Sequence, residues 1–337
     1  MIHRNLLSGK NILLIAPDYF GYEKDIIAEL KSFGANVFYI QENIDYTKFQ
    51  FKLLNRSPQR LRNKICNNHF LNEFKKLESI DLDIIFCIRI DLFNEYILDY
   101  LKSKFKNSTY ILYFWDSCKN MRNAEVISTY FDKIYTFDKK DAEDHAAVGW
   151  KFRPLFFTKE YNFITQENTN NTTDLLYIAS LSQERAQYYI QLEKYCKKNG
   201  LSLDVYFFCK NSVFYWNRIF MKEFQKVPRY YIHNKGLTKE ELIKKLKRTK
   251  AVFDCSHSSQ TGLTMRTIEC LGSSKKMITT NKQILEYDFY KNCNILLIDG
   301  YDFSEIEKFI RGDGFQQLDE KIINKYSING WLEEILL

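Results

Sequence analysis

The stretch NILLIAPDYFGYEKDIIAELKSFGANVFYI, residues 11–40, predicts the fold class of the chain. It opens with a compact apolar run, residues 11–16, which is typical of a fully buried strand. Residues 22–33 place apolar side chains on one side of a predicted helix that stops at Gly34, and residues 35–40 form a second apolar run. Strand, helix and strand in this order indicate a βαβ unit with parallel strands.

The same alternation continues along the rest of the chain. Further strands are predicted at the apolar runs 83–90, 109–115, 133–137, 174–180, 203–208, 251–256, 276–280 and 294–298. Further helices are predicted at 67–77, 94–105, 184–199, 263–271 and 322–337, and Thr238 with Glu241 forms a capping box that opens another. The polar stretch 164–173, which has no hydrophobic period, separates two such series and is predicted to be a linker.

We therefore predict an α/β chain with two Rossmann-like, doubly wound domains. Residues 1–163 form the first domain and residues 174–320 the second, with 321–337 as a C-terminal helix. The 337 residues suffice for about two domains, and the 12 glycines and 4 prolines are too few for collagen-like or low-complexity sequence.

Several classes of protein lack their signature in this sequence. It has neither GxGxxG nor GxxxxGK[ST], so nicotinamide-dependent dehydrogenases and P-loop proteins are disfavoured. The motif at residues 81–83 spells DxD but precedes its strand, so we interpret it as a turn. The five histidines show no metal-ligand spacing, and no metal or cofactor is expected.

Composition also bears on where the chain works. None of the eight cysteines forms a CxxC pair, which favours reduced thiols in a cytoplasmic protein. The first apolar run is too short for a signal peptide, and no run approaches the roughly 20 residues of a membrane span. The net charge is +7, and residues 48–64 concentrate basic side chains without an acid. That segment predicts a solvated basic face, contact with an anionic membrane surface, or contact with a phosphate-bearing acceptor.

Ligands of parallel α/β sheets bind at the carboxyl ends of the strands, so the loops there are the candidate sites. In FDCSHSSQTGLTMRTIECLG, residues 253–272, a buried strand leads through small polar residues directly into a helix. A helix N-terminus of this kind suits a phosphate group. Arg266 has the chemistry to meet phosphate oxygens, and Glu269 to accept hydrogen bonds from ribose hydroxyls. The alternative is that the two side chains pair with each other three residues apart.

Other strand ends supply weaker candidates. Ser180, Ser182 and Arg185 follow the strand 174–180 and fit phosphate contacts, although Ser182 also fits an ordinary N-cap. In the first domain, the best-placed carboxylates for a general base are Asp18, Asp91 and Asp116; helix caps or turns are the alternative for each.

Four segments carry a resemblance to a known family: 130–138 (YFDKIYTFD), 152–157 (FRPLFF), 260–269 (QTGLTMRTIE) and 275–281 (KKMITTN). Together they resemble bacterial CgeB-like and lipopolysaccharide or capsule biosynthesis glycosyltransferases. The resemblance covers most of residues 83–300. It implies the GT-B fold, in which two Rossmann-like domains face each other across a cleft.

The resemblance also implies how the chain works. The second domain would hold a nucleotide-sugar donor, with Glu269 on the ribose, Arg266 and the 256–262 loop on the diphosphate, and Asn281 lining the pocket. No bound metal would be needed, and the helix 321–337 would pack back toward the first domain. The predicted donor site comprises Ser180, Ser182, Arg185, His257, Gln260, Thr261, Gly262, Leu263, Arg266, Thr267, Glu269 and Asn281.

The expected activity is sugar transfer to a hydroxyl of a growing bacterial surface glycan, such as lipopolysaccharide, O-antigen or capsule. The acceptor would be a glycan or lipid-linked glycan, met in the cytoplasm or at the inner face of the membrane. The rival interpretations are a non-catalytic nucleotide- or sugar-binding protein, a nucleotide-sugar epimerase and a nucleic-acid binder. The modest charge and the lack of a recognisable module argue against nucleic acid as a partner.

Overall fold

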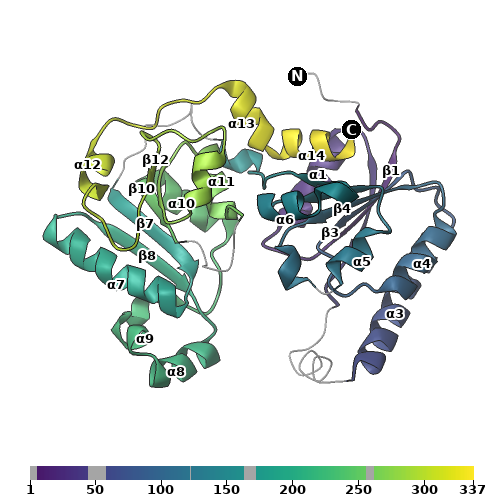
Figure 1. Cartoon of the computed structure of the whole chain (residues 1–337), viewed down its shortest axis with the longest axis horizontal. Coiled ribbons are helices and arrows are strands. Elements are labelled where there is room, and N and C mark those ends of the chain that lie inside the picture. The colour runs from purple at the N-terminus through teal and green to yellow at the C-terminus, as the bar shows by residue number, and fades with distance from the viewer. Residues whose placement is uncertain (1–5, 45–57, 122, 163–171, 256–261) are drawn as a thin grey trace. The chain divides into compact units, whose positions relative to one another are not determined.

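The computed structural model describes residues 6–44, 58–121, 123–162, 172–255 and 262–337. The chain divides into two compact units (Figure 1). Unit 1 consists of Met1–Pro154 and Trp331–Leu337, and unit 2 consists of Leu155–Gly330. The C-terminal seven-residue segment thus belongs to the same unit as the N-terminal half of the chain.

Unit 1 is built on a parallel sheet of six strands in the order β2-β1-β3-β4-β5-β6, counted within the described residues. The strands are β1 (Asn11–Ala16), β2 (Asn36–Gln41), β3 (Ile84–Ile88), β4 (Thr109–Phe114), β5 (Lys133–Thr136) and β6 (Trp150–Phe152). The chain leaves β1 for β2 on one side and returns to β3 on the other. The carboxyl ends of β1 and β3 therefore form a topological switch point, where such sheets bind ligands.

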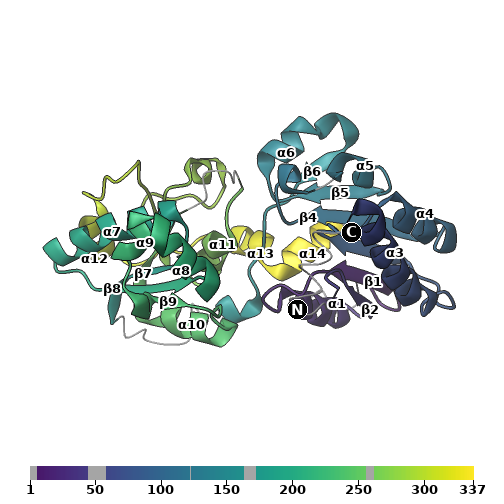
Figure 2. The same cartoon turned by 90° about the horizontal axis from the view of Figure 1, so that it is seen from below.

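Helices cover both faces of this sheet (Figures 1 and 2). They are α1 (Tyr22–Ser32), α3 (Gln59–Lys75), α4 (Glu95–Lys104), α5 (Ala124–Ser128), α6 (Lys139–Asp144) and part of α14 (Ile328–Leu336), with the short turns η1 (Cys118–Asn120) and η2 (Ala146–Val148). Phe70 of α3 and Leu98 of α4 are buried in one core with Leu112 of β4. On the other face, the ring of Trp331 lies 5.8 Å from Phe86 and 4.8 Å from Tyr113.

Unit 2 repeats the plan with a second parallel sheet of six described strands, in the order β12-β11-β10-β7-β8-β9. These are β7 (Thr173–Ser180), β8 (Leu203–Phe208), β9 (Ile232–His233), β10 (Thr249–Asp254), β11 (Lys276–Thr279) and β12 (Ile295–Leu297). Here β7 pairs with β8 on one side and β10 on the other, so the switch point lies between β7 and β10.

The helices of unit 2 again lie on both faces of the sheet (Figures 1 and 2). They are α7 (Gln183–Lys198), α8 (Asn211–Phe220), α9 (Lys222–Lys226), α10 (Lys239–Arg248), α11 (Met265–Gly272), α12 (Ile306–Arg311) and α13 (Glu320–Tyr326), with η3 (Lys159–Tyr161), η4 (Arg229–Tyr231) and η5 (Lys282–Glu286). One core joins Leu192 of α7 and Ile306 of α12 to Phe207 and Phe253 of the sheet.

Most predicted elements are present within a few residues of the predicted bounds. The strands 11–16 and 203–208 agree with β1 and β8 at both ends, and the capping box of Thr238 and Glu241 is formed at the start of α10. The prediction omitted the short strands β6 and β9 and the helices α5, α8, α9 and α12. Apart from α8, these elements have only two to six residues, too few to separate them from loops by pattern alone. Helix α8 has ten residues and an amphipathic pattern that the prediction overlooked.

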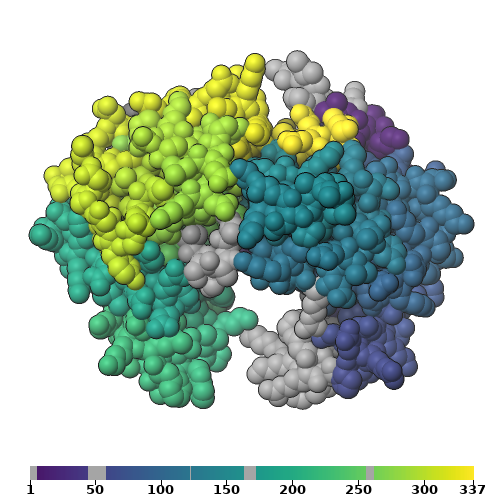
Figure 3. All heavy atoms as spheres, viewed as in Figure 1, coloured from purple at the N-terminus to yellow at the C-terminus, as the bar shows by residue number. Residues whose placement is uncertain are grey.

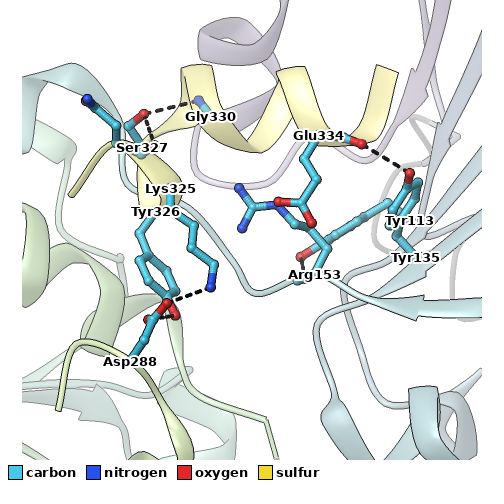
Figure 4. Close-up of polar contacts among 10 residues, drawn as sticks. Tyr113, Tyr135, Arg153, Asp288, Lys325, Tyr326, Ser327, Gly330 and Glu334 are labelled. Carbon is cyan, nitrogen blue, oxygen red and sulfur yellow. Dashed lines mark hydrogen bonds and ion pairs between the residues drawn. The ribbon is translucent and has the colours of Figure 1, made fainter. Parts of the chain in front are cut away.

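The prediction of one helix over 322–337 is wrong, because α13 and α14 are separated at Ser327. Ser327 has extended backbone and bridges to Phe157 in parallel fashion. The Phe157 N–H donates to the Tyr326 carbonyl, and the Ile328 N–H donates to the Phe157 carbonyl, both at 2.9 Å. The Ser327 hydroxyl then accepts from the Gly330 N–H at 3.2 Å, which caps α14 (Figure 4). A contact with a distant segment thus breaks the helix that the local sequence favours.

Polar contacts hold α13 in unit 2 and the part of α14 that belongs to unit 1 in that unit (Figure 4). In unit 1, the fully buried Arg153 pairs through Nε with Glu334 Oε2 at 3.0 Å, and the Tyr135 hydroxyl donates to the Glu334 carbonyl at 3.1 Å. In unit 2, Asp288 accepts from Lys325 Nζ and from the Tyr326 hydroxyl, each at 2.6 Å.

The structure also bears on the cysteines and on membrane spans. All eight cysteines lie in the described part of the chain and are free thiols, six of them buried. Burial is the main reason why the pKa values of the Cys66 and Cys255 thiols are raised, so these groups are poor nucleophiles. Across the described ranges, no helix combines the length and the apolar character needed to cross a bilayer.

Candidate functional site

The switch point of unit 2 is occupied by a cation, Arg185. Its Nη1 donates to the Ser180 carbonyl at the end of β7 (3.0 Å), and its Nε donates to the Cys255 carbonyl just after β10 (3.2 Å). The guanidinium therefore spans the carboxyl ends of two central strands. Within the described part of the chain, no carboxylate forms an ion pair with it. A positive charge without a counter-ion at this point of the sheet is suited to an anionic ligand.

The start of α11 is tied to the same edge. Thr264 is the N-cap, and its hydroxyl accepts from the Thr267 N–H at 3.3 Å. The Thr264 hydroxyl also donates to Asp254 Oδ2 at 2.8 Å, and the Thr267 hydroxyl donates to the same oxygen at 3.2 Å. Asp254 is the last residue of β10 and is buried. Two hydroxyls thus hold the N-terminus of α11 at the carboxyl end of β10.

Arg266 and Glu269 form the ion pair that the sequence left open as an alternative. Arg266 Nη1 lies 2.6 Å from Glu269 Oε2, and the Tyr161 hydroxyl donates to Glu269 Oε1 at 2.7 Å. The Glu269 side chain is 3% exposed and that of Arg266 18% exposed. Both carboxylate oxygens of Glu269 therefore already have a protein partner.

The remaining predicted donor residues fall into three groups. Asn281 is buried, donates from Nδ2 to the Gly262 carbonyl at 3.3 Å, and caps η5, so it joins β11 to the entrance of α11. Ser182 caps α7 by accepting from the Arg185 N–H, Ser180 is exposed, and Leu263 is buried. His257, Gln260 and Thr261 lie outside the described residues. We call Arg185, Asp254, Thr264 and Asn281 the unit 2 edge cluster.

Unit 1 carries a charged group at its own switch point, which we call the Arg89 cluster: Glu42, Arg89, Asp91 and Asp116. Arg89 Nε lies 3.1 Å from Asp91 Oδ2, and its Nη2 lies 3.7 Å from Asp116 Oδ2. Arg89 has a φ of 47°, in the left-handed region that non-glycine residues rarely adopt. Such backbone strain costs about 1–3 kcal/mol and clusters at functional sites.

The three predicted base candidates are not equivalent. Asp91 and Asp116 share Arg89, and Asp116 Oδ1 also accepts from the Ser117 N–H and Asn120 Nδ2, both at 2.9 Å. Asp18 is exposed after the end of β1. No hydrogen bond or ion pair joins Asp18 to the Arg89 cluster within the described residues. The structure thus brings two of the three carboxylates together and leaves the third accessible.

Glu42, which the sequence analysis missed, lies directly after β2 and is 2% exposed. Its Oε1 accepts from the Leu92 N–H at 2.7 Å, in the loop that carries Asp91. The pKa of Glu42 is raised to about 7, mainly because burial disfavours the charged carboxylate. The Leu92 hydrogen bond lowers this pKa in part, and the negative charge of Asp91 raises it.

This raised pKa predicts a pH-dependent stability. The contribution of Glu42 is fully present below its ordinary pKa of 4.5 and is lost as the pH rises through about 7. We expect the free energy of unfolding to fall by up to about 3 kcal/mol on this account between pH 4.5 and pH 8. Glu42→Gln, which keeps an acceptor for the Leu92 N–H, should remove this slope. Urea denaturation of both proteins across the pH range measures it.

Equal slopes in the wild type and in Glu42→Gln would contradict the assignment. Glu29→Gln is a matched control, because it makes the same carboxylate-to-amide change at another buried position of unit 1.

Other features of the described residues have less bearing on the site. No group of three or more His, Cys, Asp or Glu side chains among them is placed to hold a metal ion. A surface hollow of about 390 Å³ on unit 1 is lined by Arg60, Asn63, Lys64, Asn67, Asn68 and Tyr96. It includes the last part of the basic segment 48–64, most of which lies outside the described residues.

Sequence reasoning missed Glu42, Asp254 and Tyr161. Glu42 and Asp254 had a detectable signal, since Glu42 follows the predicted strand 35–40 by two residues and Asp254 is an acidic residue in the second half of the apolar strand predicted at 251–256. Tyr161 had none, because it meets Glu269 across 108 residues of sequence.

No protein-family model matches this sequence, and no curated protein sequence matches it. Solved structures do resemble the chain over its length. A glycosyltransferase from Rickettsia africae ESF-5 is 12% identical with a TM-score of 0.61, covering 97% of this chain and 96% of that one. A UDP-forming α,α-trehalose-phosphate synthase from Burkholderia xenovorans, in complex with glucose-6-phosphate, is 8% identical with a TM-score of 0.61, covering 96% and 98%.

A UDP-GlcNAc 2-epimerase from Methanocaldococcus jannaschii, in complex with UDP-GlcNAc and UDP, is 12% identical with a TM-score of 0.50, covering 91% and 96%. At these identities the likeness concerns the fold, which one scaffold can lend to different activities. The predicted α/β class, with two Rossmann-like, doubly wound parallel domains as in GT-B glycosyltransferases, is confirmed.

Proposed function

We propose that this chain is a glycosyltransferase that moves a sugar from a nucleotide-sugar donor to a hydroxyl of a bacterial surface glycan. The observation that carries the proposal is Arg185, a cation without a carboxylate partner in the described residues at the switch point of unit 2. The likeness to a glycosyltransferase and to a UDP-forming synthase supports it at the level of the fold. A lipopolysaccharide, O-antigen or capsule acceptor rests on the family resemblance of the sequence.

The donor diphosphate would lie between Arg185 and the N-terminus of α11. Fixed charges and N–H groups stabilise the negative charge that develops on the leaving diphosphate, and they need no reorganisation during the reaction. Arg266 would extend this positive surface, with His257, Gln260 and Thr261 as proposed contacts from the adjoining loop. The proposed transfer needs no metal, because protein cations stabilise the charge on the leaving diphosphate in its place. Loss of activity on adding a chelator would contradict this part of the proposal.

Glu269 would hold the ribose, and Asn281 would line the pocket. Because Glu269 is buried and paired with Arg266, ribose contact requires the Arg266 side chain to shift toward the diphosphate. On donor binding, Glu269 would exchange Arg266 for the ribose hydroxyls, and Arg266 would exchange Glu269 for the diphosphate. We propose this exchange as the way the pair serves the donor.

Asp18 is the best placed of the three candidate bases. Asp91 and Asp116 are both engaged by Arg89, whose guanidinium nitrogens lie 3.1 Å from Asp91 Oδ2 and 3.7 Å from Asp116 Oδ2. Asp18 has no such partner within the described residues, so it is the group we propose to take the proton of the acceptor hydroxyl.

A thermal-shift screen against UDP-, GDP-, CMP- and dTDP-sugars is the first test. Two of the three similar structures named above were described with UDP or as UDP-forming, so we expect UDP-sugars to stabilise the protein. A donor that binds the folded chain stabilises it by mass action and so raises the melting temperature. If no donor raises the melting temperature, the proposal is contradicted.

Arg185→Gln is expected to weaken UDP binding roughly 10- to 100-fold, the worth of a charge-assisted hydrogen bond. Uridine, which lacks phosphate, should bind both proteins equally in calorimetry. Lys198→Gln, at the exposed C-terminal end of the same helix, is the matched control. An equal loss for uridine and UDP would show that Arg185 supports the fold of the pocket and not the diphosphate.

Two rival functions predict different products. A non-catalytic binding protein would bind the donor without releasing UDP in the presence of any acceptor. An epimerase, which the likeness to the UDP-GlcNAc 2-epimerase favours as second candidate, would change the sugar while it stays on the nucleotide. Separating the sugar nucleotides after incubation distinguishes all three.

A further inference from the structure

Helix α8 turns its apolar side outward. Of its ten residues, Phe214 alone is buried, where its ring lies 6.4 Å from that of Phe224. The exposed fractions of the other large apolar side chains range from 46% to 68%: Val213, Tyr215, Trp216, Ile219 and Phe220. Surface helices of globular proteins normally show the opposite arrangement, with the apolar stripe toward the core.

These exposed side chains share one side of the helix. Val213, Trp216 and Phe220 are spaced at i, i+3 and i+7, and Tyr215 and Ile219 are four residues apart. The rings of Trp216 and Phe220 lie 5.1 Å from each other. The five side chains together make up the exposed apolar surface of α8, whose atoms are green at the lower end of unit 2 in Figure 3. An exposed apolar patch of this kind marks a binding surface.

The flanks of this surface are basic. Residues 210–236 contain six basic side chains and one acidic side chain, Glu223. All six basic residues are exposed: Lys210, Arg218, Lys222, Lys226, Arg229 and Lys235. No salt bridge joins any of them to an acidic side chain in the part of the chain that the structure describes. Their positive charge is therefore available to an anionic partner.

We propose that α8 and these basic flanks form a membrane-docking surface for anionic phospholipid bilayers. A short helix with aromatic and aliphatic residues on one side and Lys and Arg around it lies in the headgroup region with its apolar face inserted. Each nearby cation adds attraction to an anionic surface. A second copy of the chain fits less well, because a two-fold interface would bring like basic flanks together.

The proposal is independent of sugar transfer, because membrane binding is measured without donor or acceptor. It differs from the basic segment 48–64 in resting on the exposure of described side chains. Docking would hold unit 2 at the same surface as a lipid-linked acceptor.

Trp216 makes the insertion directly measurable. It is the exposed tryptophan at 65%, whereas Trp150 and Trp331 are buried and Trp115 is half-buried. The full-length protein is titrated with vesicles of phosphatidylcholine and phosphatidylglycerol in equal amounts. We expect a blue shift of tryptophan emission, and quenching when the phosphatidylcholine carries brominated chains. No shift and no quenching would overturn the proposal.

Substitutions on the surface separate the apolar part from the charged part. Ile219→Ser combined with Phe220→Ser should weaken vesicle binding at least about tenfold, since each removes a large apolar side chain from the interface. Lys222→Glu combined with Lys226→Glu should weaken it at least about tenfold on mixed vesicles. Val148→Ser and Lys151→Glu change exposed residues of unit 1 and should leave binding unchanged.

Three other outcomes would contradict the proposed membrane-docking surface. Equal binding to phosphatidylcholine vesicles without phosphatidylglycerol would overturn the role of the basic flanks. Equal losses in the unit 1 controls would overturn the assignment to α8. A dimer seen by light scattering that Ile219→Ser with Phe220→Ser dissociates would identify a second copy as the occupant instead. The replaced side chains are exposed, so all variants should keep the wild-type circular dichroism.

Discussion

Glu269→Ala is expected to lower the free energy of unfolding by about 3–5 kcal/mol, because it leaves the largely buried Arg266 cation without its carboxylate. It also removes the acceptor of the Tyr161 hydroxyl, which is buried. Urea denaturation followed by circular dichroism measures the loss as a lower midpoint.

The matched control is a pair with the same three-residue spacing at the surface. Lys308 lies 3.6 Å from Glu305, with side chains 85% and 64% exposed, and Glu305→Ala should change stability by less than about 1 kcal/mol. A double variant, Glu269→Leu with Arg266→Met, should recover much of the loss, since a buried pair replaced by apolar side chains leaves no unpaired charge. A Glu269→Ala loss as small as that of the control would contradict the buried-pair account.

A second substitution of Glu269 tests whether this residue holds the ribose of the donor. Glu269→Gln keeps an acceptor for Tyr161, and the folded protein can be compared for UDP and 2′-deoxy-UDP by calorimetry. If Glu269 holds the ribose, the wild type prefers UDP and the variant loses that preference. If both proteins show the same preference, Glu269 acts through the fold alone and the donor is held by other groups.

Asp18→Asn is expected to lower kcat for sugar transfer roughly 10²- to 10⁴-fold, the range for loss of a general base. The amide is close in size to the carboxylate but cannot take a proton. Because Asp18 is exposed in unit 1, the substitution should leave the melting temperature and donor affinity unchanged. Release of the nucleotide in the presence of acceptor is the measurement.

Asp81→Asn is the matched control for Asp18, since it is an exposed aspartate at the amino end of β3, the edge opposite the switch point. It should retain wild-type kcat. Asp91→Asn and Asp116→Asn should disturb Arg89, with a different signature: a change in KM or stability as well as kcat. A wild-type kcat in Asp18→Asn would remove this residue from the reaction.

Local patterns in the sequence determined much of the fold. The apolar runs of β1 and β8 and the capping box of α10 depend on neighbouring residues, so their bounds could be predicted. The sequence likewise placed Arg266 and Glu269 near a strand end, since α11 is the next described element after β10. The sequence also specified that these two side chains can meet, because residues three apart are neighbours on the same side of a helix.

Only the tertiary structure decided which of the possible contacts form. Arg89, Asp91 and Asp116 meet because β3 and β4 are neighbours in the sheet, and Glu42 joins them through the loop after β3. Tyr161 reaches Glu269 from a distant segment.

The C-terminal helices and α8 also show that packing contacts decide what the sequence pattern leaves open. The bridge between Phe157 and Ser327 overrides the helical pattern around it. Helix α8 has an ordinary amphipathic sequence, and only the packing of Phe214 shows that its larger apolar side faces water. Sequence periodicity specifies that a helix has two faces, whereas the free energy of packing in the folded chain selects the one that is buried.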